Sequence, residues 1–224
     1  DITWENGEKE TVFFSITIKS KSYDKLSAYG EFISRSDVNW DDIEESIYLD
    51  KSKIKEGLVT LRIIDVSGAE LWSEKLSTSH AGWEQLFLCE MDGKQYLLRY
   101  NPAMFQGYCT YVYTLFTLED DKEKVIRTNE LEFDINGTNE LDVTEMIGFA
   151  DEVNTLLGES SLLISSNGGD FSFGLQSADS FYERFSWLDE YKELFTEEDS
   201  LESKLQKFSE YAVSNQKKML EHKE

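Results

Sequence analysis

The segment GYCTYVYTLFTL, residues 107–118, restricts the fold more than any other part of the sequence. Its β-branched and aromatic residues predict a long β-strand, whose side chains point alternately to the two faces of a sheet. One face carries Tyr108, Val112 and Phe116, and the other carries Tyr111 and Leu115. Because both faces are largely apolar or aromatic, we expect other parts of the chain to cover this strand on each side.

Several other segments have the composition of strands. Short turn signals separate most of them, such as DVSG at 65–68 and EDDKE at 119–123. Short connections favour antiparallel neighbours, so residues 1–135 predict an antiparallel β-meander of about seven strands, for which a propeller-like arrangement is one option. The expected strands are residues 11–18, 58–65, 69–76, 83–90, 94–101, 107–118 and 124–135.

Residues 20–57 fit this strand pattern poorly, and we interpret them as an insertion between the first two strands. Within them, Trp40, Ile43 and Ile47 have a spacing that predicts a short helix.

Residues 136–224 predict a helical cover for the sheet. Apolar residues recur at helical spacing in three segments, residues 141–160, 177–195 and 198–213. Asp142 followed by Glu145 resembles a capping box, with Thr144 as the alternative cap, and a hairpin is expected around Asn167–Gly168. The sequence therefore predicts an α+β fold with about three C-terminal helices packed on the sheet, as one continuous domain.

The charge of the chain limits its partners. The 45 acidic and 22 basic residues give a net charge of -23, which argues against a nucleic acid partner. A cationic ligand, calcium or a basic protein partner stays compatible with this charge, and so does a simple role in solubility. A membrane-spanning helix needs about 18 consecutive apolar residues, and no apolar run approaches that length, so we expect no span within this chain.

Catalytic patterns are weak in this sequence. His80 is the single histidine outside the C-terminal tail, and the chain lacks a G-x-S-x-G elbow, an H-E-x-x-H motif and a glycine-rich phosphate loop. We therefore expect His80 to stabilise a loop or to contact a ligand, and we assign no catalytic residue. A pair of carboxylates that hydrolyses glycans is an alternative, but 45 acidic residues make that signal unspecific.

The two cysteines, Cys89 and Cys109, fall on expected strands that have one strand between them. A disulfide requires Cα atoms within about 7 Å, so two free and mostly buried thiols are the favoured interpretation, with a bridge as the alternative.

The first residues, DITWENGEKETV, resemble a degenerate calcium loop. The candidate calcium ligands are Asp1, Thr3, Glu5 and Glu10. The glycine is displaced by one position and Val12 stands where a glutamate is expected, so a turn without metal is the favoured interpretation, with a weak calcium site as the alternative, and no other cofactor is expected.

A group of polar and aromatic residues at the ends of the central strands forms the candidate ligand site. Arg99 is the most informative member, because a guanidinium inside a sheet covered on both faces must either pair with a carboxylate or meet a ligand. In so acidic a chain the internal salt bridge is the default. The candidate ligand-binding residues are His80, Trp83, Arg99, Tyr100, Asn101, Gln106 and Tyr111.

Three motifs in this region carry a resemblance to a known family: HAGW at 80–83, DGKxYLLRYxP at 92–102 and QGYxxYxYxLF at 106–116. They resemble an uncharacterised clostridial family of exported domains. Its members occur as lipoproteins and as the extracytoplasmic C-terminal part of membrane proteins similar to the β-lactam-sensor metallopeptidases. The resemblance covers most of residues 58–190 and implies a location and a class of protein, without implying a mechanism.

Together these features predict a non-enzymatic ligand- or partner-binding domain of sensor type. The resemblance implies that it is extracellular or anchored on the outer face of a Gram-positive cell. The expected partner is a small molecule, a cell-wall fragment or a protein. The alternatives are a carboxylate-pair hydrolase of cell-wall glycans and a purely structural or protein-interaction domain.

Overall fold

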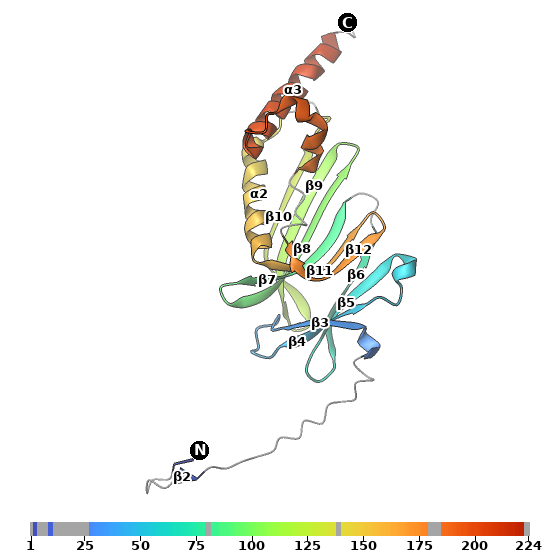
Figure 1. The fold of residues 1–224 in the computed structure, drawn as a ribbon, viewed down its shortest axis with the longest axis vertical. Coiled ribbons are helices and arrows are strands. Elements are labelled where there is room, and N and C mark those ends of the chain that lie inside the picture. Colours follow the sequence, from blue (N-terminus) through green and yellow to red (C-terminus); the bar gives the residue numbers. More distant parts are fainter. Residues whose placement is uncertain are drawn as a thin grey trace.

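The computed structural model describes residues 2–3, 9–10, 27–78, 82–137, 140–178 and 185–221 (Figure 1). Near the N-terminus, β1 (Ile2–Thr3) and β2 (Lys9–Glu10) form a small antiparallel pair. The main body of the described residues consists of two antiparallel sheets, three helical segments in the C-terminal half and two short 3-10 helices in the first half.

The first sheet has four strands in sequence order, β3-β4-β5-β6. A short 3-10 helix, η1 (Ser27–Tyr29), precedes it, and another, η2 (Ile54–Glu56), precedes β5. The strands are β3 (Glu31–Ser36), β4 (Glu45–Asp50), β5 (Leu58–Ile64) and β6 (Glu70–Ser77).

The second sheet has six strands in the order β10-β9-β8-β7-β11-β12. Successive hairpins join β7 through β10, while β11 returns after a helix to pair with β7. The strands are β7 (Trp83–Met91), β8 (Lys94–Phe105), β9 (Tyr108–Glu119), β10 (Lys122–Asp134), β11 (Ser160–Asn167) and β12 (Asp170–Ser177).

Three helical segments lie on one face of the six-stranded sheet (Figure 1). The first, α2 (Val143–Gly158), begins at Asp142, whose carboxylate accepts a hydrogen bond from the Glu145 N–H at 2.9 Å, so the predicted cap is confirmed. The others are the 3-10 helix η4 (Ser186–Leu194) and α3 (Leu201–Glu221). Among the described residues, no helix is long and apolar enough to span a membrane.

The six-stranded sheet is covered by helices on one face and by the four-stranded sheet on part of the other, so the two-sided burial predicted for residues 107–118 is confirmed only near Phe116. Tyr111 and Leu115 pack against the helices, while Phe116 packs in a second core with residues of the four-stranded sheet such as Leu61. The molecule thus has three layers: helices, six-stranded sheet and four-stranded sheet. The C-terminal helices supply only one of the two covers, and the other comes from the first half of the chain.

The α+β class and the antiparallel sheets are confirmed, but the number and grouping of strands differ from the prediction. The two sheets contain ten strands, and neither closes into a propeller. Residues 31–36 and 45–50, which we interpreted as part of an insertion, pair with each other as β3 and β4, and β4 pairs with β5. The predicted strand at 11–18 lies outside the described residues.

The helix predicted from Trp40, Ile43 and Ile47 is wrong. Side-chain oxygens of Asp37 and Asp41 accept hydrogen bonds from backbone N–H groups of residues 41–43. These local bonds hold a bent loop in place of a helix, and they place Ile47 in the core strand β4.

Both cysteines are buried thiols that form no disulfide, as the favoured interpretation predicts. Cys89 lies on β7 and Cys109 on β9, with β8 between them. Burial raises the pKa of the Cys89 thiol above its ordinary value, so this thiol stays protonated and packs as a small apolar side chain.

Candidate functional site

Arg99, the most informative predicted site residue, lies on the face of β8 that meets the four-stranded sheet. Its guanidinium holds Glu74 of β6 with two bonds, Nε to Oε1 at 2.9 Å and Nη2 to Oε2 at 2.6 Å. Nη2 also reaches Oε1 of Glu123 on β10 at 2.8 Å. The guanidinium carbon lies 4.8 Å from the ring centroid of Phe116, and Trp72 donates to Glu123. We call these five residues the Arg99 cluster.

The Arg99 guanidinium finds both of its carboxylate partners within the fold, and the cluster as a whole carries one net negative charge. Burial opposes the charge of Arg99, but the hydrogen bonds to Glu74 and Glu123 outweigh it and raise the guanidinium pKa above its ordinary value. The default expectation of an internal salt bridge is therefore confirmed. A ligand at Arg99 would have to displace one of these carboxylates.

The remaining predicted ligand residues are not brought together. Tyr100 and Tyr111 are buried beneath the helices, on the opposite face of the sheet from Arg99. The side chain of Asn101 accepts a hydrogen bond from the Gln85 backbone, which makes it part of the β7–β8 pairing.

Three more predicted positions lie at the margins of the sheet. Gln106 is exposed in the β8–β9 turn, and Trp83 begins β7 half-buried. His80 lies outside the described residues. The predicted site is therefore dispersed, because residues that follow one another along a meander alternate between its two faces.

The candidate calcium ligands are described only in part. Asp1 and Glu5 lie outside the described residues, while Thr3 and Glu10 fall on β1 and β2. Across the described ranges, no group of three histidine, cysteine, aspartate or glutamate side chains is arranged to hold a metal ion.

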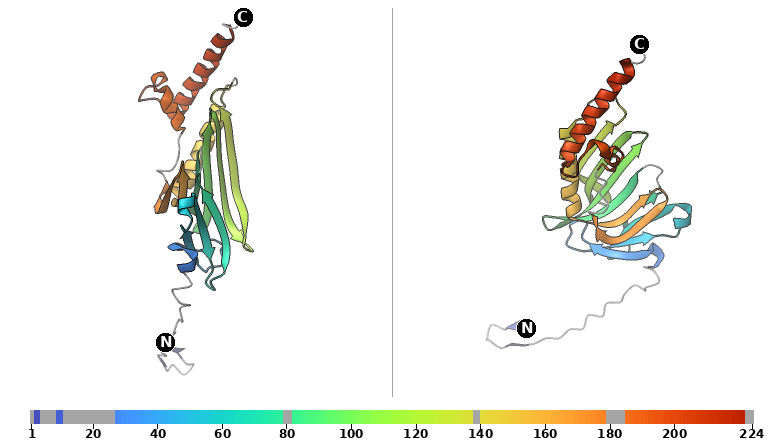
Figure 2. Two further views of the ribbon diagram at one scale, coloured as in Figure 1. Left: turned by 90° about the vertical axis from the view of Figure 1, so that its right-hand side faces the viewer. Right: turned by 45° about the horizontal axis from the view of Figure 1, so that its top comes forward.

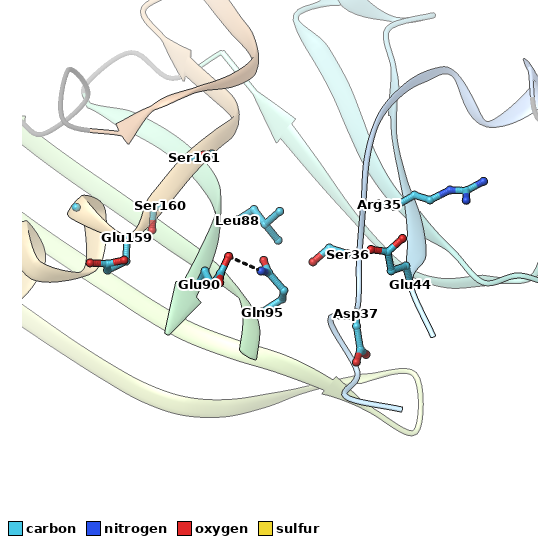
Figure 3. Close-up of a pocket in the computed structure, with 11 residues that line it drawn as sticks. Arg35, Ser36, Asp37, Glu44, Leu88, Glu90, Gln95, Glu159, Ser160 and Ser161 are labelled. Atoms are coloured by element: carbon cyan, nitrogen blue, oxygen red, sulfur yellow. Dashed lines mark hydrogen bonds between the residues drawn. The ribbon is translucent and has the colours of Figure 1, made fainter. Parts of the chain in front are cut away.

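A pocket of ≈ 620 Å³ opens where the two sheets meet near the β7–β8 hairpin (Figure 3). One wall is the end of β3 and the loop that follows it, with Ser36, Asp37 and Glu44. Such a volume lies within the range of small-molecule binding sites. None of its lining residues belongs to the ligand site predicted from the sequence.

The opposite side of the pocket combines the β7–β8 hairpin with the junction of α2 and β11. Glu90 and Gln95 from the hairpin are joined by a hydrogen bond of 2.9 Å, and Glu159 and Ser160 line the junction. The Glu90 N–H donates to the Glu159 carbonyl at 2.8 Å, which ties the two parts together.

The pocket is acidic. Asp37, Glu44, Glu90 and Glu159 line it, and the one basic lining residue is Arg35. Figure 3 shows the Arg35 guanidinium directed away from the hairpin side of the pocket. The C-terminal end of α2 lies at the same place and adds the negative end of its dipole. The arrangement favours a ligand that carries positive charge.

Ser36 is the most unusual group in the pocket. Its residue is 4% exposed, and its hydroxyl has no hydrogen-bond partner within the described part of the chain. Figure 3 shows the side chain directed toward Gln95 across the pocket. Buried hydroxyls are normally hydrogen-bonded, so an unpaired hydroxyl in the wall of a pocket marks a position at which a ligand could supply the missing bond.

The loop that forms the Ser36 wall is held firmly to both sheets. The Val38 N–H donates to the Glu45 carboxylate at 3.1 Å, and the Leu118 N–H donates to the Val38 carbonyl at 3.0 Å. The Trp40 indole donates to the Gln95 carbonyl at 2.8 Å. The wall is thus positioned before any ligand arrives.

Glu45 lies directly across the sheet from Ser36 and is only 2% exposed. Burial raises its pKa to about 7; the hydrogen bond from Val38 opposes this, and the nearby Asp41 and Asp37 add to the rise. Glu45 shares its face of β4 with the core residues Ile47 and Leu49 and does not line the pocket. It therefore holds the loop in place and is not placed to meet a ligand.

No known protein family, curated protein or solved structure matches this chain. The resemblance to the clostridial exported family stays a prediction.

Proposed function

We propose that this chain is a binding domain of sensor type whose ligand is a small, positively charged molecule held in the acidic pocket. The extracytoplasmic location belongs to the same proposal and is supported by the sequence motifs alone. The chain would act by binding, without transforming the ligand.

One observation carries the proposal: Ser36, whose buried hydroxyl has no partner among the described residues, lines an acidic pocket of ≈ 620 Å³. Leaving a buried polar group unpaired costs about 1–3 kcal/mol, which a ligand that pairs with it would recover. An ammonium group fits both features, because it donates to the hydroxyl oxygen and to the carboxylates.

The hydrolase alternative has weaker support. A general acid needs a raised pKa and access to substrate. Among the described residues, Glu45 is the carboxyl whose pKa is raised, and it is buried away from the pocket lining.

Thermal unfolding with a matched ligand set tests the proposal. The set contains 1,4-diaminobutane, spermidine and glucosamine, with uncharged 1,4-butanediol and N-acetylglucosamine as controls. A ligand at one hundred times its dissociation constant stabilises by about 2.7 kcal/mol, which is several degrees for a chain of this size. We expect a shift with at least one amine and none with its uncharged match.

Two variants locate the binding site. Glu90→Gln removes a pocket charge and should weaken the amine-dependent shift, whereas Glu198→Gln removes an exposed charge outside the pocket and should leave it unchanged. Equal loss in both variants would show that the amine responds to the overall charge of -23, and the pocket assignment would then fail.

A further inference from the structure

A second surface, separate from the pocket, is formed by the end of the six-stranded sheet that the four-stranded sheet leaves uncovered. Along β9, Tyr111 and Tyr113 pack against the helices, so Tyr108 and Val112 point to the other face. The left view of Figure 2 shows the helices on one side of β9 and β10, with no described element beside their upper part on the other. This end of the sheet presents a bare face.

Three carboxylates form a row on this face. The register of β9 and β10 pairs Val112 with Glu130 and Tyr108 with Asp134, and Glu132 lies between these two acids on the same face. Residues two apart in a strand are separated by about 6.8 Å, so the row extends for about 14 Å. All three acids are exposed.

Two exposed aromatic rings adjoin this row. Phe105 of β8 pairs with Tyr108 of β9, and they are 65% and 48% exposed. A hydrogen bond with Glu132 raises the pKa of the Tyr108 hydroxyl, which keeps the phenol neutral and close to the carboxylates. We call Phe105, Tyr108, Val112, Glu130, Glu132 and Asp134 the acidic sheet face.

We propose that the acidic sheet face binds a basic segment of another protein. Carboxylates pair with lysine and arginine, and the faces of phenylalanine and tyrosine rings attract the same cations, so both kinds of group on this surface select one chemistry. A second copy of this chain is a poor occupant, because each copy would bring a like-charged row to the contact. Nucleic acid and anionic lipid are disfavoured in the same way.

The test uses a labelled ten-residue peptide of alternating lysine and threonine, with the glutamate–threonine peptide as its control, in fluorescence anisotropy at low salt. We expect binding of the lysine peptide alone. The variant Glu130→Gln/Glu132→Gln should weaken it at least tenfold, and Phe105→Ala/Tyr108→Ala about threefold. Circular dichroism should show that both variants remain folded.

The matched controls change equal groups elsewhere. Glu197→Gln/Glu198→Gln removes the same charge beside α3, and Leu175→Ala truncates an exposed apolar residue on β12. Both should bind the peptide within twofold of the original chain. Absence of binding up to millimolar peptide, or equal weakening by Glu197→Gln/Glu198→Gln, would overturn the proposal. Neither control touches the pocket, so the amine-binding proposal is tested separately.

Discussion

The Arg99 cluster and the acidic pocket both border the layer between the two sheets, yet they differ in how their charges are compensated. At Arg99, a guanidinium that is 23% exposed is held by two carboxylates and an aromatic ring. At the pocket, four carboxylates meet one arginine that points away, and the Ser36 hydroxyl has no partner in the described structure. The polar groups of the Arg99 cluster are paired without a ligand. Those of the pocket would be paired by a ligand that carries positive charge.

This difference changes where function should be sought. A basic residue in an acidic chain attracts attention in the sequence, but its carboxylate partners are provided by the same fold. The more informative sites are those at which buried polar groups and like charges have been left without compensation, because such groups are destabilising unless something binds.

The largest effect we expect concerns Glu45, the uncompensated carboxyl behind the pocket. Its pKa is about 7 in the folded state against 4.5 for a free side chain, so between these pH values the folded chain binds more protons than the unfolded chain. The contribution of Glu45 to the free energy of unfolding should therefore be fully present below pH 4.5 and be lost as pH rises through 7. The loss should reach about 3 kcal/mol.

Urea unfolding at several pH values measures this pH dependence in the original chain and in Glu45→Gln. The glutamine keeps an acceptor for the Val38 N–H and cannot ionise. The variant should be less sensitive to pH than the original chain, and the more stable of the two at pH 8. Parallel pH profiles would mean that Glu45 ionises in the folded state without cost.

The next effect concerns the compensated cluster. Arg99→Ala leaves Glu74 and Glu123 facing each other without a cation and removes the contact with Phe116. Breaking a fully buried pair lowers the free energy of unfolding by about 3–5 kcal/mol. Because these side chains are partly solvated, we expect Arg99→Ala to lower it by about 2 kcal/mol. Lys124→Ala, which breaks an exposed pair with Glu119, should cost less than about 1 kcal/mol.

Urea unfolding of both variants measures the two values. If Arg99→Ala left the free energy of unfolding unchanged but abolished amine binding, Arg99 would belong to the ligand site, as the sequence predicts.

The sequence was informative about the layers and much less so about the site. Burial of both faces of β9 near Phe116, the Asp142 cap and the separation of Cys89 from Cys109 follow from local rules of alternation and capping. β3 and β4 were missed because charged residues such as Arg35 and Glu45 interrupt their apolar pattern, although Glu45 faces the core.

The pocket could not be predicted from spacing, because its walls come from three separate parts of the chain. Ser36, Glu90 and Glu159 meet only after the two sheets have packed. The one local signal was the Asp37, Asn39 and Asp41 pattern, whose side-chain oxygens bind the backbone of their own loop. Motif searches favour residues that are close in sequence, and this site is assembled by tertiary contacts.

The smallest expected effect tests the comparison most directly, because it changes the same atom at two buried serines. Ser166 is fully buried and donates to the Ser77 carbonyl at 2.7 Å, whereas Ser36 has no partner in the described residues. Ser166→Ala should therefore lower the free energy of unfolding by about 1 kcal/mol, while Ser36→Ala should leave it unchanged or raise it slightly.

The same two variants should exchange their order when amine binding is measured by thermal shift. Ser36→Ala should weaken binding, and Ser166→Ala should retain it, because Ser166 does not line the pocket. If Ser36→Ala instead destabilises the chain as much as Ser166→Ala, its hydroxyl already has a structural partner. The pocket would then be as internally satisfied as the Arg99 cluster, and the contrast between the two regions would no longer indicate where the ligand binds.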